Sequence, residues 1–231
     1  MSLALALALA LPLAGKTVAI DPGHNGGNAA HVAQIARLVD AGTVQKACDT
    51  VGASTNDGYA EHAHNFDVAL RLARALRARG ARVVLTRTTD TGWGPCITRR
   101  AAIANAAHAD AAISIHADGG PPGGRGFHVI YPRSIAGLTD DITARSRRLA
   151  LDVRGAFATG TGEPYSTYAG TRGLDVRSDL GGLNRSDVPK VFVETANMRN
   201  AWDARRLRSA RHRQREANAL ARGLAAFLAR A

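Results

Sequence analysis

The stretch that decides the fold is KTVAIDPGHNGG, residues 16–27, in which a short apolar run leads directly into a glycine-rich turn. The run at 16–21 has the composition of a strand that is covered on both faces. The turn carries His24 among glycines, which allow tight turns and a close approach of the backbone. A buried strand that ends in such a turn is typical of a parallel α/β sheet, in which ligands bind beyond the carboxyl ends of the strands.

The same pattern recurs along the chain and predicts the fold class. Further strand candidates, rich in valine and isoleucine and without strict alternation, lie at residues 81–86, 111–116, 127–131 and 190–194. Segments with helical periodicity lie at residues 61–79, 98–108, 140–158 and 204–229. Because strands alternate with helices, we expect βαβ units. The expected fold is α/β, with a twisted, mostly parallel central sheet of about six strands flanked by helices on both faces.

Length and composition predict a single folded domain over residues 15–231. The chain has 231 residues, of which 45% are hydrophobic, and no internal repeat or linker divides it. Residues 1–14, MSLALALALALPLA, form an uncharged run of leucine and alanine. A membrane-spanning helix needs about 20 apolar residues, so the run is too short to span. It resembles the apolar part of a signal peptide that lacks a basic start; the alternative is a helix packed on the domain.

The charge balance and the two cysteines bear on partners and location. Lysine and arginine number 30 against 19 acidic residues, a formal net charge of +11. Such a charge favours anionic surroundings, namely nucleic acid, an acidic membrane face or wall polymers, unless arginine is simply abundant in this sequence. Cys48 and Cys96 form an even pair that suits one disulfide in an oxidising compartment. With the signal-like start, they predict an exported protein.

Three of the expected strands lead to side chains that can do chemistry. One strand runs into His24, a second ends in His116 and a third ends in Glu194. Because the carboxyl ends of parallel strands meet at one edge of a sheet, we expect these side chains to converge there. Glu61 opens the helix at 61–79 beside a glycine-rich loop, from which it can turn toward the same edge.

Two imidazoles and a carboxylate are a ligand set of catalytic zinc, because they leave the fourth tetrahedral position to water. Zinc lowers the pKa of that water to about 7, and a second carboxylate nearby can take its proton as a general base. The residues alone leave the ligands open, since Glu61 is also a suitable charge for the start of a helix. The competing imidazoles are His62, His64, His108 and His128, of which His64 is the strongest because it lies near Glu61.

Four segments around these residues resemble the zinc-dependent N-acetylmuramoyl-L-alanine amidases, the family that includes bacterial cell-separation amidases. They occur in family order and with similar spacing: VAIDPGHNGG around His24, GYAEHAHNFDVALRLARAL with Glu61 and Asn65, TRRAAIANAAHADAAISIHAD around His116, and DVPKVFVETANMRNAWDA around Glu194. Together they extend the resemblance from residue 16 to the last helix, over nearly all of the chain.

The resemblance implies one zinc ion per chain, held by His24, Glu61 and His116, with Glu194 as the catalytic glutamate. It therefore chooses Glu61 over His64. The bond cleaved would be the amide between N-acetylmuramic acid and the L-alanine of the peptidoglycan stem peptide, for wall remodelling, cell separation or muropeptide recycling. The cysteine pair also resembles that of an actinobacterial subgroup.

The expected partner is accordingly peptidoglycan or a muropeptide, and the expected location is secreted, either periplasmic or in the cell wall. We expect no nucleic acid, no stable membrane insertion, a monomer, and no separate wall-binding domain. The segment at 28–59 lies between two of the expected ligands and should border the active site. Two rival hypotheses are a zinc carboxypeptidase that cuts within the stem peptide and a wall-binding module without catalytic activity.

Overall fold

A six-stranded sheet with the order β4-β1-β5-β8-β6-β7 forms the centre of the structure, a computed structural model that describes residues 11–230. The strands of this sheet are β1 (Thr17–Pro22), β4 (Arg82–Leu85), β5 (Ala111–Asp118), β6 (His128–Pro132), β7 (Leu174–Arg177) and β8 (Lys190–Asn197). Strands β4, β1, β5 and β8 are parallel, whereas β6 pairs antiparallel with β8 and β7 runs parallel to β6. The expected α/β fold with a mostly parallel sheet is confirmed.

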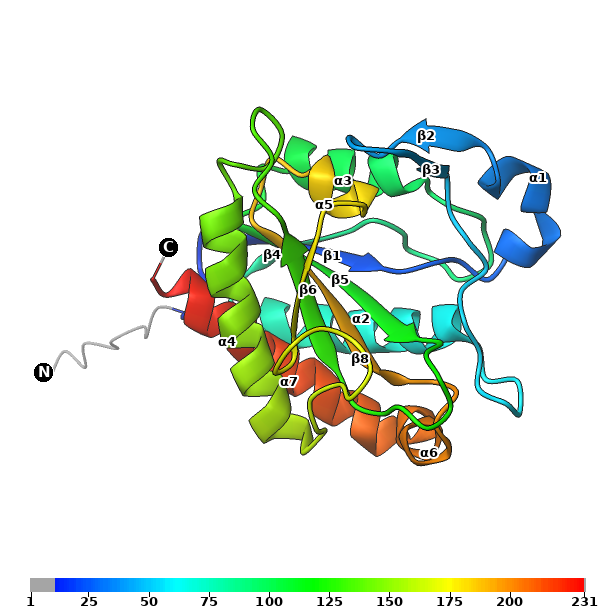
Figure 1. Ribbon diagram of the computed structural model, residues 1–231. Coiled ribbons are helices and arrows are strands. Elements are labelled where there is room, and N and C mark those ends of the chain that lie inside the picture. The colour runs from blue at the N-terminus through cyan, green and yellow to red at the C-terminus, as the bar shows by residue number, and fades with distance from the viewer. Residues whose placement is uncertain (1–10, 231) are drawn as a thin grey trace, which may run out of the picture.

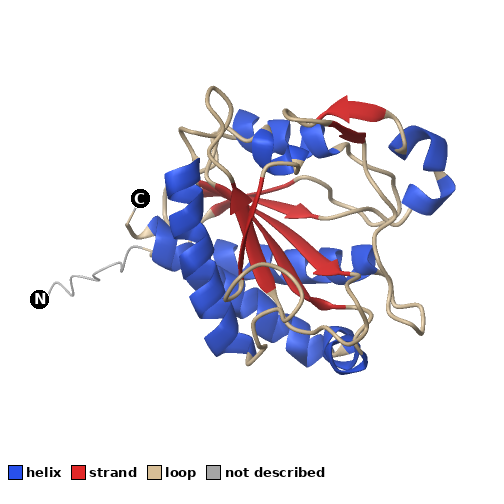
Figure 2. Cartoon of the chain, in the orientation of Figure 1, coloured by secondary structure: helices blue, strands red, loops and turns tan. Residues whose placement is uncertain are grey.

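Helices cover both faces of the sheet (Figures 1 and 2). One face packs against α2 (Glu61–Arg77), α4 (Thr143–Thr161) and α7 (Ala210–Leu228). The other face is covered by α3 (Ile97–Ala106) and α5 (Gly181–Asn184). The main core lies on the first face, where alternate residues of the central strands meet the apolar stripes of the helices. The sheet is thus fixed on one side by bulky apolar packing, and its carboxyl edge is left open to carry a site.

Short elements occupy the two segments that sequence patterns leave unassigned, 25–59 and 160–184. They are η1 (Asn28–Ala30), α1 (Val32–Ile35), the hairpin of β2 (Leu38–Asp40) and β3 (Gln45–Ala47), strand β7 and helix α5. Each has three or four residues, too few for a periodic pattern to be recognised.

The last helical segment differs from its prediction. A single helix is expected over 204–229, but the structure has α6 (Ala201–Arg208) followed by α7, with Ser209 between them. The side chain of Ser209 accepts a hydrogen bond from the backbone N–H of His212, so it caps the first turn of α7. Serine is a preferred N-cap residue, and this local bond explains why a new helix starts there.

The signal-like run at 1–14 lies mostly outside the described residues. Of its last four residues, Leu13 is buried in the main core, and its N–H donates to the carbonyl of Arg79 at the end of α2. These residues therefore pack on the domain. Across residues 11–230, no helix has both the length and the apolar character that a membrane crossing requires.

Candidate metal centre and active site

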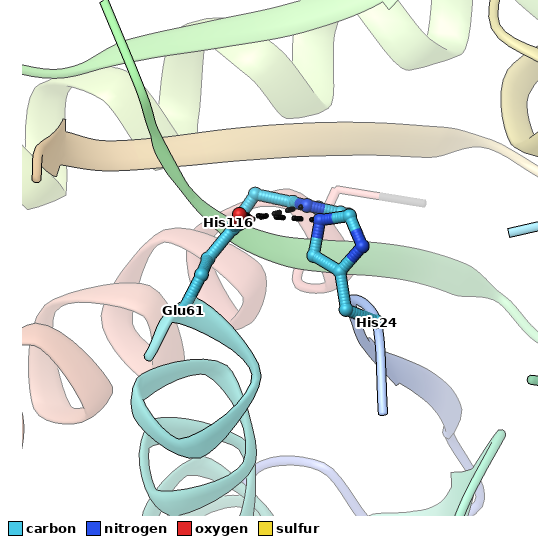
Figure 3. Close-up of side chains that lie close together, drawn as sticks. All are labelled: His24, Glu61 and His116. Atoms are coloured by element: carbon cyan, nitrogen blue, oxygen red, sulfur yellow. Dashed lines mark hydrogen bonds and ion pairs between the residues drawn. The ribbon is translucent and has the colours of Figure 1, made fainter. Parts of the chain in front are cut away.

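His24, Glu61 and His116 meet at the carboxyl edge of the sheet (Figure 3). Glu61 Oε2 lies 3.2 Å from His24 Nε2, and Glu61 Oε1 lies 3.0 Å from His116 Nδ1. One ligand atom from each residue lies within 4.8 Å of the other two, and no other group in the described part of the chain has this arrangement. Ligands of one zinc ion at bond lengths near 2 Å are roughly 3–4 Å apart, so this donor set fits a single ion.

His24 is held by the segment that follows β3. His24 itself lies just beyond β1 with φ +58°, a left-handed conformation that is uncommon for a residue other than glycine and often occurs at functional sites. Its Nδ1–H donates to the carbonyl oxygen of Thr50 at 2.9 Å, which leaves Nε2 facing Glu61. A hydrogen bond of this kind on the far ring nitrogen fixes the tautomer and orientation of a metal-binding histidine.

Glu61 begins α2 and is fixed by backbone and side-chain donors. Its Oε2 accepts from the N–H of Ala53 at 2.7 Å, and its Oε1 accepts from the N–H of Ala117 at 3.2 Å. The amide nitrogen of Asn65, one turn along α2, donates to Oε1 at 3.3 Å and to the carbonyl of Gly23 at 3.2 Å. Asn65 therefore orients Glu61 toward the turn that carries His24.

Two glycines make room for the histidine rings. A Cβ atom at Gly23 would lie 2.1 Å from Cε1 of His116, so the ring fits only against bare backbone. Gly52 has φ +86°, and a Cβ atom there would lie 2.7 Å from Cδ2 of His24. The ring of His116 also stacks on Phe192, with ring centroids 5.2 Å apart. The backbone around the site is thus shaped to these imidazoles.

The electrostatic field among these side chains is negative. Burial raises the pKa of Glu61, but His24 and His116 outweigh it and hold the pKa well below its usual range. Burial lowers the pKa of His24, but the carboxylates of Glu61 and Asp49 outweigh it and raise the pKa to about 10. Negative charges that hold a proton on the His24 imidazole this firmly also favour a metal dication at the same place.

Glu194 lies beside His116, because the two residues are paired in the β5–β8 ladder. It lines the same hollow as His24, Glu61 and His116. Its Oε2 is shielded from solvent and has no hydrogen-bond partner among the described residues. Burial, together with the negative charges of Glu61 and Asp118, raises the pKa of Glu194 well above its usual range. Glu194 is therefore a carboxyl group with no competing partner, as a proton-transferring residue should be.

Arg100 of α3 anchors the turn that carries His24. Its guanidinium donates to Asp21 Oδ1 and Asp49 Oδ2, both at 2.9 Å. It also donates to the carbonyl oxygens of Pro22 at 2.7 Å and His24 at 3.0 Å. One buried side chain thus joins the end of β1 to the segment that contacts the far nitrogen of His24.

The disulfide joins the same two parts of the molecule. Cys48 and Cys96 are bonded, as the cysteine pair predicts, across a sequence separation of 48 residues. Cys48 precedes Asp49, and Cys96 is the N-cap residue of α3. The segment at 28–59 accordingly borders the site, as expected from its place between two of the site residues.

The competing histidines do not join the cluster. Nδ1 of His62 lies 2.8 Å from Asp90, and His64 is buried against Thr195 on the opposite face of the sheet. His128 is buried on β6, and His108 follows α3 in a left-handed turn.

Sequence reasoning missed the residues that support the site, namely Asp21, Asp49, Thr50 and Arg100. Two signals were present: Asp49 adjoins a cysteine, and Arg100 lies in the segment quoted around His116. Neither signal assigns a contact without the path of the loop between β3 and α2.

Two hollows, of about 440 Å³ and 430 Å³, meet at the site. Both are lined by His24, Thr50, His116, Leu180 and Phe192. The first extends under the β2–β3 hairpin, and the second contains Glu61, Asp118, Arg177 and Glu194. A substrate can therefore extend in two directions from the histidines.

Comparison with known proteins identifies the family. The profile of the family described as N-acetylmuramoyl-L-alanine amidase (Amidase_3) matches residues 18–226. The N-acetylmuramoyl-L-alanine amidase Rv3717 of Mycobacterium tuberculosis is 45% identical over 217 residues, which is 94% of this chain and 88% of that protein. The chain belongs to the N-acetylmuramoyl-L-alanine amidases. The expected enzyme class, a hydrolase of peptidoglycan, is thereby confirmed.

Solved structures of other family members agree in fold. The N-acetylmuramyl-L-alanine amidase Ami1 of Mycobacterium smegmatis has a TM-score of 0.89 and 42% identity, covering 95% of this chain and 99% of that one. The apo form of Ami1 of Mycobacterium abscessus has a TM-score of 0.88 and 40% identity, covering 94% of this chain and 100% of that one. The family resemblance read from the four sequence segments is confirmed, and these relatives are mycobacterial.

Proposed function

We propose that this amidase depends on one zinc ion bound by His24, Glu61 and His116, with Glu194 as the catalytic carboxylate. The observation that carries the proposal is the convergence of two imidazoles and a carboxylate around one point, beside a second carboxylate that has no partner. Structural zinc sites use four protein ligands, whereas three ligands leave a position for water and are the mark of a catalytic site.

The residues divide the chemistry between binding and proton transfer. Zinc, when bound, supplies Lewis acidity that polarises a carbonyl group and lowers the pKa of water to about 7. Glu194 takes the proton of the attacking water as a general base and delivers it to the departing nitrogen of L-alanine as a general acid. The raised pKa of Glu194 suits the second step, because a carboxyl group of raised pKa can hold a proton long enough to donate it.

The shape of the site supports a substrate that is bulky on both sides of the cleaved bond. The amide that joins N-acetylmuramic acid to L-alanine has a sugar on one side and a peptide on the other. Two hollows that meet at His24 and His116 give each part a place of its own. A free muropeptide and a peptidoglycan strand would both present such an amide.

The disulfide and the charge support a location outside the cytoplasm. The bond between Cys48 and Cys96 would persist in the oxidising surroundings of the periplasm or cell wall. A formal net charge of +11 suits anionic wall polymers. The protein would act there as a secreted monomer, with residues 15–231 as one catalytic domain and no nucleic-acid partner.

Product analysis tests this function directly. The purified protein is incubated with a muramoyl-peptide, and the products are identified by mass spectrometry, with and without a zinc chelator. The amidase should release a peptide that begins with free L-alanine, and the chelator should abolish the release. A shortened stem peptide still joined to muramic acid would instead indicate a carboxypeptidase. Release that persists after complete removal of the metal would contradict the zinc site.

A further inference from the structure

One buried hydroxyl group, behind the site, joins the three elements that carry Glu61, His116 and Glu194. Thr195 follows Glu194 on β8 and points to the opposite face of the sheet, because neighbouring strand residues alternate between faces. Its Oγ1 lies 3.0 Å from the carbonyl oxygen of His116 on β5 and 3.0 Å from Nε2 of His64 on α2. Thr195 and His64 are both fully buried.

Counting the hydrogens fixes the direction of these two bonds. The carbonyl oxygen of His116 can only accept, so Thr195 gives it the single hydroxyl hydrogen. Oγ1 of Thr195 must then accept from Nε2–H of His64. Burial and the nearby charge of Arg213 lower the pKa of His64 to about 3, so the neutral ring has one N–H. With both Thr195 bonds made, that hydrogen lies on Nε2 and points to Thr195, while the backbone of Leu207 is a further polar neighbour of the ring.

The hydroxyl acts where the ladder between β5 and β8 changes register. His116 pairs with Glu194, but Asp118 pairs with Asn197, so β8 has one residue more than β5 over this span. The extra residue lies between Glu194 and Asn197, and bulges of this kind redirect side chains next to active sites. The bond from Thr195 to His116 therefore fixes the last regular pair before the register changes.

Glu216 of α7 does not compete for His64. It is fully buried, its Oε2 lies 3.5 Å from Nε2 of His64, and neither of its oxygens has a hydrogen-bond partner among the described residues. Burial, with the negative charge of Glu163, raises the pKa of Glu216 well above its usual range. The distance from Nε2 of His64 to Glu216 is also longer than that to Thr195, 3.5 Å against 3.0 Å. The contact that orients the His64 ring is its hydrogen bond to Thr195.

We propose that Thr195 and His64 are positioning residues, whose hydrogen bond locks α2, β5 and β8 together and so sets the arrangement of Glu61, His116 and Glu194. Thr195 faces away from the hollow and acts through its neighbours, as outer residues around metal ligands do. The inference rests on the proposed function, because it concerns the geometry of that same site.

The test compares two substitutions of Thr195 with a matched control. Thr195→Val keeps the shape but removes the hydroxyl, whereas Thr195→Ser keeps the hydroxyl. The control is Thr139→Val, which removes another fully buried hydroxyl that bonds the carbonyl of Arg133 in the turn before α4. For each protein, kcat and KM on a muramoyl-peptide, the Kd of zinc by chelator competition, and the thermal unfolding midpoint are measured.

Thr195→Val should lower kcat and weaken zinc binding by roughly 10- to 100-fold each, with KM within about twofold of wild type, since outer-shell losses act on the metal and the chemistry. Thr195→Ser should stay within about threefold of wild type on both measures. Thr139→Val should change stability alone. A double variant with His64→Leu should lose no more than the larger single loss, because both changes remove one shared bond.

Two results would contradict these expectations in different ways. If the wild type binds zinc and cleaves the substrate, but Thr195→Val matches Thr139→Val in kcat and in zinc Kd, the positioning role is wrong and the proposed function stands. If the wild type neither binds zinc nor cleaves, the proposed function is wrong and the positioning role with it.

Discussion

The two faces of the sheet hold buried polar groups in opposite ways at the same edge. On the face of the active site, Asp21 accepts from Arg100 at 2.9 Å and from Ser114 at 2.6 Å, with the ammonium of Lys190 at 3.4 Å. On the other face, His64 and Thr195 form a hydrogen bond beside the buried carboxyl group of Glu216, whose pKa burial raises well above its usual range. Buried charges are therefore paired with each other around Asp21, whereas Thr195 is a neutral group that bonds a ring nitrogen and a carbonyl oxygen.

The two faces therefore support the site in different ways. Charged side chains beneath the three site residues hold the backbone of the turn around His24, but each of them depends on its partner. Neutral groups on the far face orient neighbouring residues through hydrogen bonds, and the loss of one such group leaves no unpaired charge behind. Substitutions on the two faces should therefore differ in size and in what they change.

The largest effect on activity should come from substitution of Glu194, which lines the hollow and whose Oε2 has no hydrogen-bond partner among the described residues. Glu194→Gln removes the proton-transferring group, so kcat should fall by roughly 100- to 10,000-fold. Bound zinc and the thermal unfolding midpoint should remain close to wild type, because Glu194 is not one of the proposed zinc ligands and its Oε2 has no hydrogen-bond partner among the described residues. Steady-state kinetics on a muramoyl-peptide, with zinc analysis of the same samples, make the measurement. Activity within tenfold of wild type would remove Glu194 from the mechanism.

Asp21→Asn should cause the largest loss of stability. It leaves Lys190 fully buried without its carboxylate and removes one of two carboxylates that Arg100 contacts. Removing one partner of a buried ion pair costs about 3–5 kcal/mol of unfolding free energy. Urea denaturation of both proteins at neutral pH measures the difference. A loss below about 1 kcal/mol would mean that the charges on this face behave like surface pairs.

The same pair of proteins has a defined pH dependence. Burial raises the pKa of Asp21, but Lys190 and Arg100 outweigh it and hold the pKa far below its usual range. The stability that this carboxylate contributes is therefore fully present above its unfolded-state pKa of about 4 and is lost as the pH falls toward the folded value. The difference between wild type and Asp21→Asn should shrink progressively below about pH 4. A difference that stays constant down to pH 2 would show that charge is not its cause.

The disulfide should have the next largest effect. Replacing Cys48 and Cys96 by serine frees a loop of 48 residues and should lower the unfolding free energy by about 2–4 kcal/mol. Because the bond also joins the segment at Asp49 to α3, zinc affinity should fall in the same variant. Calorimetry and chelator competition measure the two effects. Unchanged zinc affinity would separate the disulfide from the site.

Thr195→Val should have the smallest effect on stability, so that substitutions on the two faces differ in the unfolding free energy they cost. The substitution removes two neutral hydrogen bonds, one to the carbonyl of His116 and one from His64, and leaves no buried charge, so it should cost about 1–3 kcal/mol. Urea denaturation should thus rank it well below Asp21→Asn. A loss as large as that of Asp21→Asn would mean that the far face also depends on paired charges.

The sequence predicts the residues that chemistry places at strand ends, but not those that depend on the path of a loop. His24, His116 and Glu194 follow from apolar strands and from the rule that parallel strands end at one edge. Glu61 required the family resemblance, because His64 lies three residues away on the same helix. Thr50 could not be predicted, since its contact with His24 depends on the fold of segment 25–59.

The fold shows the same division. The long buried strands are predicted because continuous apolar runs mark them, and each lies within a few residues of its expected place. The hairpin of β2 and β3 escapes prediction because its strands have three residues each and none of these residues is fully buried. The break at Ser209 depends on a capping bond, which helical periodicity on either side conceals.

The most direct test of the account is the zinc content of the wild type and of His116→Ala, purified from zinc-replete cells and dialysed. We expect close to one zinc ion per chain in the wild type and almost none in His116→Ala, because two ligands hold zinc poorly. A wild type without zinc, or a His116→Ala protein that keeps its full zinc content, would contradict the metal centre formed by His24, Glu61 and His116.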